Sequence, residues 1–209
     1  MKTFHLKTGL IIVFAAITVH PAYSQPKTPK EVEAMLDNYS ISLNFDAKNH
    51  YHFYQARCKE GSVFRMEGDD GNYAFTLYDV VSKKVYRLNS RTKTGKVMPL
   101  DPRMSNDGIS PMLASHLFLH TNYLDDENFK KTDRHETVAG RKATVYTMTF
   151  GDGKGTFWID DQYGFTLKYS QEGSSALSTE VTEFKTGGVA MADMVNLNEY
   201  KIEEMSENK

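Results

Sequence analysis

Four histidines in two closely spaced pairs are the residues whose types and spacing could bind a metal ion, although the signal is weak. His50 and His52 are two residues apart in a strand-like segment, so their side chains would point the same way. His116 and His120 are four residues apart, which places them on one face of a helix. Two such pairs could supply four metal ligands, but no carboxylate or cysteine framework accompanies them, and the glutamate of a metalloprotease HExxH motif is missing. We therefore interpret the histidines as structural and predict no metal, with a metal-binding enzyme as the less favoured alternative.

Other catalytic patterns are missing or unspecific. The acidic turns at Asp69-Asp70, Asp152 and Asp160-Asp161 do not have the spacing of a calcium-binding EF-hand, and aspartate is common in tight turns. The sequence contains no G-x-S-x-G elbow, no G-x-G-x-x-G fingerprint and no phosphate-binding P-loop. We predict no catalytic residues, no cofactor and a protein that is not an enzyme.

The first 24 residues have the composition of a secretory signal peptide. Lys2 and Lys7 precede a short apolar run at Gly9–Val19, and Ala22-Tyr23-Ser24 is a small-x-small cleavage site. Cleavage after Ser24 would leave residues 25–209, which is a suitable length for a single domain. The protein is expected to be periplasmic or secreted, and no cysteine follows the cleavage site to carry a lipid anchor.

Charge and cysteine content exclude several classes of partner. Loss of Lys2 and Lys7 would change the formal charge from −2 to −4, and without a basic block a nucleic-acid partner is not expected. No second apolar run of about 18 residues exists, so no transmembrane segment is predicted. Cys58 is the only cysteine; we expect it to be buried and the protein to be a monomer.

Alternating hydrophobicity predicts a mainly β (α+β) chain. The stretch Val138–Gln171 contains three strands joined by the turns GDGKG and DQYG, which is typical of an antiparallel meander. After residue 90 the pattern loosens through the basic stretch Arg91–Lys96. The expected strands are Tyr39–Asp46, Tyr51–Arg57, Ser62–Glu67, Tyr73–Tyr78, Val85–Asn89, Ala143–Phe150, Gly155–Asp160, Phe165–Gln171, Thr179–Lys185 and Asn196–Ile202.

Two helices are expected against one face of a curled antiparallel sheet. The first begins at Thr28 as the N-cap, with Pro29 at the first helical position and Glu31 completing a capping box with Thr28. Its apolar stripe consists of Val32, Met35, Leu36 and Tyr39. The second spans Ile109–His120 and carries its own apolar stripe, which includes Leu117.

The strands are rich in aromatic residues, with 12 Phe and 12 Tyr in the chain. Ordinary core packing explains many of them. The functional interpretation is an apolar cavity between the curled sheet and its helices, large enough for an acyl chain. Trp158 is informative here, because its face of the strand is opposite to that of Phe157 and Ile159. The candidate cavity residues are Phe45, Phe64, Met66, Phe75, Leu117, Met148 and Trp158.

Three segments resemble the LolA/LolB/RseB-like group of periplasmic proteins, in particular its outer-membrane-lipoprotein-sorting-like relatives in Bacteroidetes. They are ETVAGRKATVYTM (Glu136–Met148), GTFWIDDQYGFTLKYSQ (Gly155–Gln171) and TEFKTGGVAMADM (Thr182–Met194). The resemblance implies an unclosed antiparallel β half-barrel whose concave face is covered by helices, with a hydrophobic cavity between them. LolA members carry lipoprotein acyl chains, whereas LolB members are lipid-anchored and this sequence has no lipidation cysteine.

These observations favour an exported, non-enzymatic protein that binds a lipid, an acyl chain or the hydrophobic part of an envelope partner. The alternative is a structural or interaction module with a solid core and a protein partner.

Overall fold

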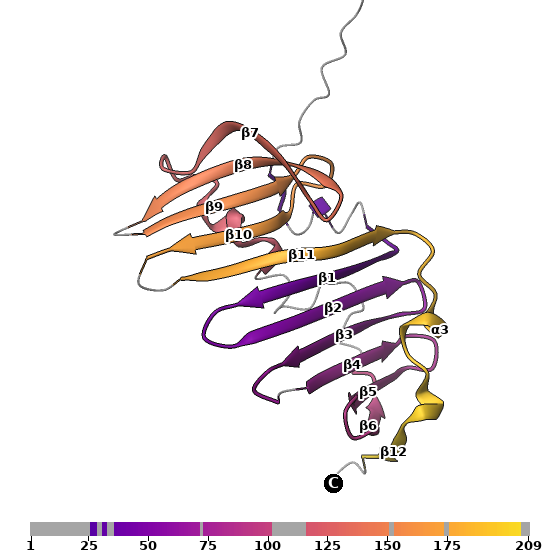
Figure 1. Ribbon diagram of the computed structural model, residues 1–209. Helices are drawn as coiled ribbons and strands as arrows, with labels where there is room; N and C mark the ends of the chain where they lie inside the picture. The colour runs from indigo at the N-terminus through magenta and orange to yellow at the C-terminus, as the bar shows by residue number, and fades with distance from the viewer. Residues whose placement is uncertain are drawn as a thin grey trace, which may run out of the picture.

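The computed structural model describes residues 26–28, 31–32, 36–71, 73–101, 116–150, 153–173 and 176–205. Twelve strands within these ranges form one sheet that does not close on itself (Figure 1). No helix among the described residues is long and apolar enough to cross a membrane. The signal peptide predicted for residues 1–24 lies outside the described residues.

The order of the strands in the sheet is β12-β6-β5-β4-β3-β2-β1-β11-β10-β9-β8-β7. All neighbours pair antiparallel except β12 and β6, which are parallel. The strand bounds are β1 Tyr39–Asp46, β2 His50–Cys58, β3 Gly61–Gly68, β4 Tyr73–Asp79, β5 Lys84–Asn89, β6 Thr94–Pro99, β7 Lys130–Val138, β8 Arg141–Phe150, β9 Gly153–Asp160, β10 Thr166–Glu172, β11 Leu177–Thr186 and β12 Lys201–Glu204.

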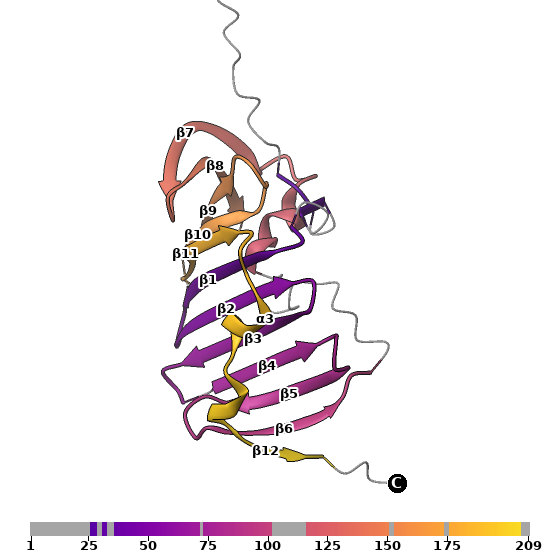
Figure 2. The same ribbon diagram turned by 90° about the vertical axis from the view of Figure 1, so that its right-hand side faces the viewer.

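Strand β1 joins two meanders. The strands β1 to β6 extend from it in chain order on one side, and the strands β11 back to β7 extend on the other. After β11 the chain runs past the ends of the β1–β6 strands and adds β12 at the far edge (Figures 1 and 2). The strand direction turns steadily along the sheet, as the right-handed twist of β-strands requires.

The predicted antiparallel sheet is confirmed, and so is the central meander, which corresponds to β8, β9 and β10. The hairpin turn that joins β7 to β8, Ala139-Gly140, has positive φ at both residues, 50° and 74°, which matches the twist of the flanking strands. The prediction was wrong in two places. Arg91–Lys96 was expected to be irregular but leads into β6, and Asn196–Ile202 was expected to be one strand but forms a 3-10 turn, η2 (Leu197–Glu199), before β12.

The capping box predicted at Thr28 is confirmed. The Thr28 backbone N–H donates to Glu31 Oε2 at 2.8 Å, and the Glu31 N–H donates back to Thr28 Oγ1 at 3.4 Å. These bonds satisfy amide groups that a helix start leaves without partners. Val32 and Leu36 from the predicted apolar stripe are buried, and Met35 lies outside the described residues.

Helices that cover the sheet are not supported. Among the described residues the one α-helix with defined ends is the four-residue α3 (Met191–Met194). Of the predicted Ile109–His120 helix, only residues 116–120 are described. His116 and Leu117 are helical, but the chain then tightens into a 3-10 turn, η1 (Leu119–Tyr123). The Thr121 N–H bonds to the Phe118 carbonyl, an i→i+3 contact that replaces the α-helical bond.

The sheet has two chemically different faces, which cross-strand register identifies. The inner face carries Ile41, Leu43 and Phe45 of β1, and residues 116–123 pack against it. The outer face carries Ser40, Ser42 and Asn44 of the same strand. The alternation predicted for Tyr39–Asp46 is therefore confirmed, with the apolar side turned toward the main core.

The C-terminal segment covers the outer face of β2 to β5. Met194 of α3 joins Cys58, Val63 and Leu77 in a buried apolar cluster, and Ile202 packs at its margin. Burial raises the pKa of the Cys58 thiol, so this residue has the inert character that the sequence predicts.

Candidate functional site

Five large side chains form a continuous surface on the inner face of β1, β2 and β3, which we call the aromatic floor. Leu43 of β1 pairs with Phe53 of β2, which pairs with Met66 of β3, so these positions form one cross-strand row. The neighbouring pairs of the same face add further rings. The floor consists of Phe45, Tyr51, Phe53, Phe64 and Met66.

The rings of the floor are packed side by side at the margin of the main buried cluster. The Phe53 ring stacks on Phe64 at a centroid distance of 6.0 Å and on Tyr51 at 6.1 Å. The Phe45 ring meets Phe53 edge-on at 6.4 Å. Phe53 is buried, with 3% of its surface exposed, whereas the other four floor residues are half-buried. The floor therefore keeps apolar surface that further apolar groups can contact.

His116 and Leu117 lie at the floor. The imidazole ring of His116 is 4.8 Å from the Phe45 ring and 5.5 Å from the Phe53 ring. Burial lowers the pKa of His116, so the ring is neutral at physiological pH and adds to the apolar character of the site. Leu117 is buried in the same cluster.

Four of the seven candidate cavity residues lie at the aromatic floor. Phe45, Phe64 and Met66 belong to the floor and Leu117 lies against it. Phe75 is on the outer face, where it packs in the cluster with Met194. Met148 shares a separate inner-face cluster with Phe157 and Tyr169. The residues that the sequence interpretation missed are Tyr51 and Phe53, although their alternation with His52 in a strand-like run was a usable signal.

Trp158 is a buried member of the main apolar cluster, but the cross-strand register places its side chain on the outer face of the sheet. It pairs with Lys168, which pairs with Glu180, which pairs with Asn44. Directly paired residues project from the same face, so Trp158 is opposite to Phe45. Its indole N–H donates to Glu136 Oε2 at 2.8 Å, and the Lys168 ammonium is 5.4 Å from the ring centroid. Through the hydrogen bond to Glu136, Trp158 on β9 holds β7 against the outer face of the sheet.

The two histidine pairs do not converge. His50 and His52 pair with Asp46 and Asn44 and lie on the outer face, whereas His116 is on the inner face. His120 is fully buried, with Nδ1 at 2.8 Å from Thr166 Oγ1 and Nε2 at 3.2 Å from the Lys27 carbonyl oxygen. Within the described ranges no group of three or more His, Cys, Asp or Glu side chains is placed to hold a metal ion.

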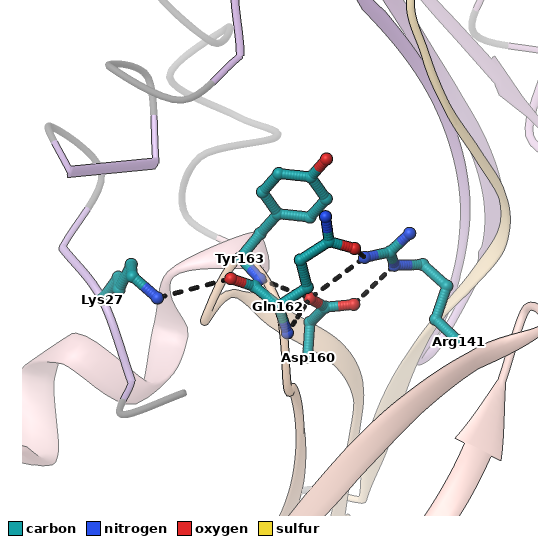
Figure 3. Close-up of polar contacts among 5 residues, drawn as sticks. All are labelled: Lys27, Arg141, Asp160, Gln162 and Tyr163. Atoms are coloured by element: carbon teal, nitrogen blue, oxygen red, sulfur yellow. Dashed lines mark hydrogen bonds and ion pairs between the residues drawn. The ribbon is translucent and has the colours of Figure 1, made fainter. Parts of the chain in front are cut away.

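A buried ion pair fixes the turn between β9 and β10. Asp160 is fully buried and accepts hydrogen bonds from the guanidinium group of Arg141 and from the backbone N–H groups of Gln162 and Tyr163 (Figure 3). Arg141 lies over the Tyr163 ring at 4.9 Å. A surface hollow of about 660 Å³ adjoins this network. Every oxygen of Asp160 has a donor, so we assign the network to stabilising the turn.

The same turn holds the N-terminal segment. The Lys27 N–H donates to the Gly164 carbonyl at 2.9 Å, and its ammonium lies 3.5 Å from the Gln162 carbonyl oxygen (Figure 3). His120 contacts the Lys27 carbonyl from the other side. These contacts tie the N-terminal segment, η1 and β10 together beside the inner face.

Comparison with known proteins adds little. No known family profile matches the chain, and no curated protein is significantly similar to it in sequence. Among solved structures, an uncharacterized conserved protein from Thermus thermophilus has a TM-score of 0.45 at 11% identity, over 84% of this chain and 96% of that one. PNGF-II in space groups C2 and P21 has TM-scores of 0.32 and 0.33 at 10% identity, over 81% of this chain and 31% and 32% of PNGF-II. At these scores the likeness carries no functional argument, and the LolA-like resemblance stays a prediction.

Proposed function

We propose that this protein is an exported, non-enzymatic binding protein that holds an acyl chain against the aromatic floor. One observation carries the proposal: four of the five floor residues are only half-buried although they lie side by side on the inner face. Elsewhere on this face, Ile41, Leu43 and Phe157 are fully enclosed. A half-buried apolar surface of this kind can be covered further by an apolar ligand.

The energetics favour a long chain over a small apolar molecule. Burial contributes about 0.8 kcal/mol for each CH₂ group. Association costs at least about 4 kcal/mol in lost translational and rotational freedom. A chain of four or five carbons therefore only offsets that cost, and about ten or more are needed for stable binding. The proposed ligand is a lipid or lipoprotein chain of that length, covered from the side of His116 and Leu117.

Titration with alkyl alcohols tests the proposal on two matched variants. Phe64→Gln removes a half-buried ring from the floor, and Tyr86→Gln removes a half-buried ring from the outer face two strands away. We expect dodecanol to bind the unaltered protein, to bind the Phe64→Gln variant at least about tenfold more weakly, and to bind the Tyr86→Gln variant with unchanged affinity. Absence of dodecanol binding to the unaltered protein, or equal losses in both variants, would overturn the proposal and favour an interaction module with a protein partner.

The native ligand can be sought directly. Protein purified from its native envelope should release an alkyl-chain lipid on organic extraction, detected by mass spectrometry. N-terminal sequencing of the same preparation should begin at Gln25 if the export proposal holds. A sequence beginning at Met1 would contradict export without bearing on the binding site.

A further inference from the structure

The aromatic floor continues across the inner face into a row of different chemistry. Phe64 on β3 pairs with Thr76 on β4, which pairs with Arg87 on β5, which pairs with Lys96 on β6. The inner face therefore changes from aromatic, through small and polar, to basic within four neighbouring strands. Strands lie about 4.8 Å apart, so about 10 Å separates Phe64 from Arg87 along the row.

The basic end of the row lies in a surface hollow of about 560 Å³. Ala74 and Thr76 line the hollow on the side of the floor, and Arg87 and Lys96 line it on the other side. Two cations directly opposite each other on neighbouring strands repel, which destabilises the sheet. The side chains of Arg87 and Lys96 are both exposed, and neither side chain has a hydrogen bond or ion pair with another part of the chain that the structure describes.

Strand β12 adds one more cation and one anion to the same hollow. Ile202 pairs with Gly95 and packs in the outer-face cluster, so its neighbours Lys201 and Glu203 project to the inner side. Both line the hollow. Glu203 is opposite Lys96 in register and offsets one charge, which leaves an excess of two positive charges at the site. In contrast, the nearby Lys93 forms an ion pair with Glu199 at 2.9 Å.

The geometry points to a subsite for the anionic head group of an amphiphile, formed by Arg87, Lys96 and Lys201, whose alkyl chain lies on the aromatic floor. This inference rests on the proposed function and specifies the ligand class. Arg87 can bind a phosphate or carboxylate through two parallel hydrogen bonds. Lys96 and Lys201 add charge attraction from two neighbouring strands.

Position, rather than charge alone, distinguishes this subsite from a general anion site. The hollow adjoins the floor through Ala74, which pairs with Met66. A molecule that fills both must have an anionic end and an apolar end within one chain length. Free phosphate would contact only the exposed cations, in competition with water and salt.

Three probes separate the contributions of the head and the chain. Dodecyl phosphate has both, dodecanol has the chain with a neutral head, and butyl phosphate has the head with a short chain. Titrations compare the unaltered protein with the double variant Arg87→Gln/Lys96→Gln. The matched control, Lys84→Gln/Lys154→Gln, removes the same charge from two exposed lysines outside the hollow.

We expect dodecyl phosphate to bind the unaltered protein about tenfold or more tightly than dodecanol, and the double variant to lose that advantage while its dodecanol affinity is unchanged. The control should retain the advantage.

Equal dodecyl phosphate affinity in the double variant and the unaltered protein would overturn the head-group subsite and leave the proposed function standing. Binding of butyl phosphate as tight as that of dodecyl phosphate would also overturn it, because such binding would indicate a phosphate site to which the alkyl chain contributes nothing. Failure of both dodecyl ligands to bind would overturn the proposed function itself.

Discussion

Phe64 on β3 and Arg87 on β5 lie in one cross-strand row of the inner face, with only Thr76 on β4 between them. This relationship places an aromatic surface and a cation about two strand spacings apart. On the inner face, apolar side chains on β3 therefore give way to basic side chains on β5 and β6. The proposed binding of an amphiphile, with its alkyl chain on the floor and its anionic head at Arg87, depends on that arrangement.

Trp158 serves as a control residue because it is opposite to the floor. Trp158→Phe keeps an aromatic ring but removes the indole N–H that bonds to Glu136. We expect the free energy of unfolding to fall by about 1 kcal/mol, with dodecanol affinity unchanged. Urea denaturation and titration of the same preparation measure the two effects. A tenfold loss of affinity would place Trp158 in the binding site, contrary to the register.

Filling the hollow should block ligands without unfolding the protein. Ala74→Trp introduces an indole ring between Met66 and the basic residues, into space that the hollow provides. Stability should change by less than about 0.5 kcal/mol, while dodecyl phosphate binding weakens at least about tenfold. Thr182→Trp, at an exposed position of β11, is the matched control and should bind normally. Normal binding by both variants would mean that the hollow holds no ligand.

His120 should make stability depend on pH in the acidic range. Its burial lowers the pKa from 6.5 to about 4 in the folded protein, so between these values the unfolded chain binds the extra proton. Stability is therefore fully present above pH 6.5 and decreases as pH falls toward 4, by at most about 3 kcal/mol. Denaturation at pH 7 and pH 4.5 measures the difference, and His120→Gln should reduce it. An identical pH dependence in the variant would assign the effect to other groups.

The Asp160 network should matter for stability through two separable contributions. Asp160→Ala removes the ion pair with Arg141 and the carboxylate oxygen that accepts from the two backbone N–H groups of the turn, and we expect a loss of about 3 kcal/mol. Asp160→Asn keeps an oxygen that can accept from the Gln162 N–H, at 2.8 Å in the native protein, so its loss should be smaller. Urea denaturation gives both values. Equal losses would show that the turn bonds contribute nothing beyond the charge.

Local patterns in the sequence predicted most of the elements correctly. The alternation in Tyr39–Asp46 and the reciprocal pair Thr28 and Glu31 are local signals, and both are present in the structure. Strands at or near the ends of the sheet were harder to predict. Strand β7 is charged on both sides and β6 contains Gly95 and Pro99, so neither shows the alternation of a half-buried strand.

The site could be predicted only in part because face identity is not local. Alternation shows that Trp158 and Phe157 point to opposite faces, but it does not show which of them faces Phe45. That depends on pairing through β10, β11 and β1, where register shifts occur beside Lys168 and Leu43. One shift reverses which residues share a face. For the same reason Phe75 could not be separated from Phe64 before the pairing was known.

Photochemical labelling tests the central claim most directly. A dodecyl phosphate analogue with a diazirine at the end of its chain should, on irradiation, attach to the aromatic floor. Peptide mapping by mass spectrometry should then find the label on Phe45, Phe53, Phe64 or Met66, with labelling suppressed by excess dodecyl phosphate. Labelling confined to the outer face, at Trp158 or Tyr86, or labelling that excess ligand does not suppress, would contradict the account.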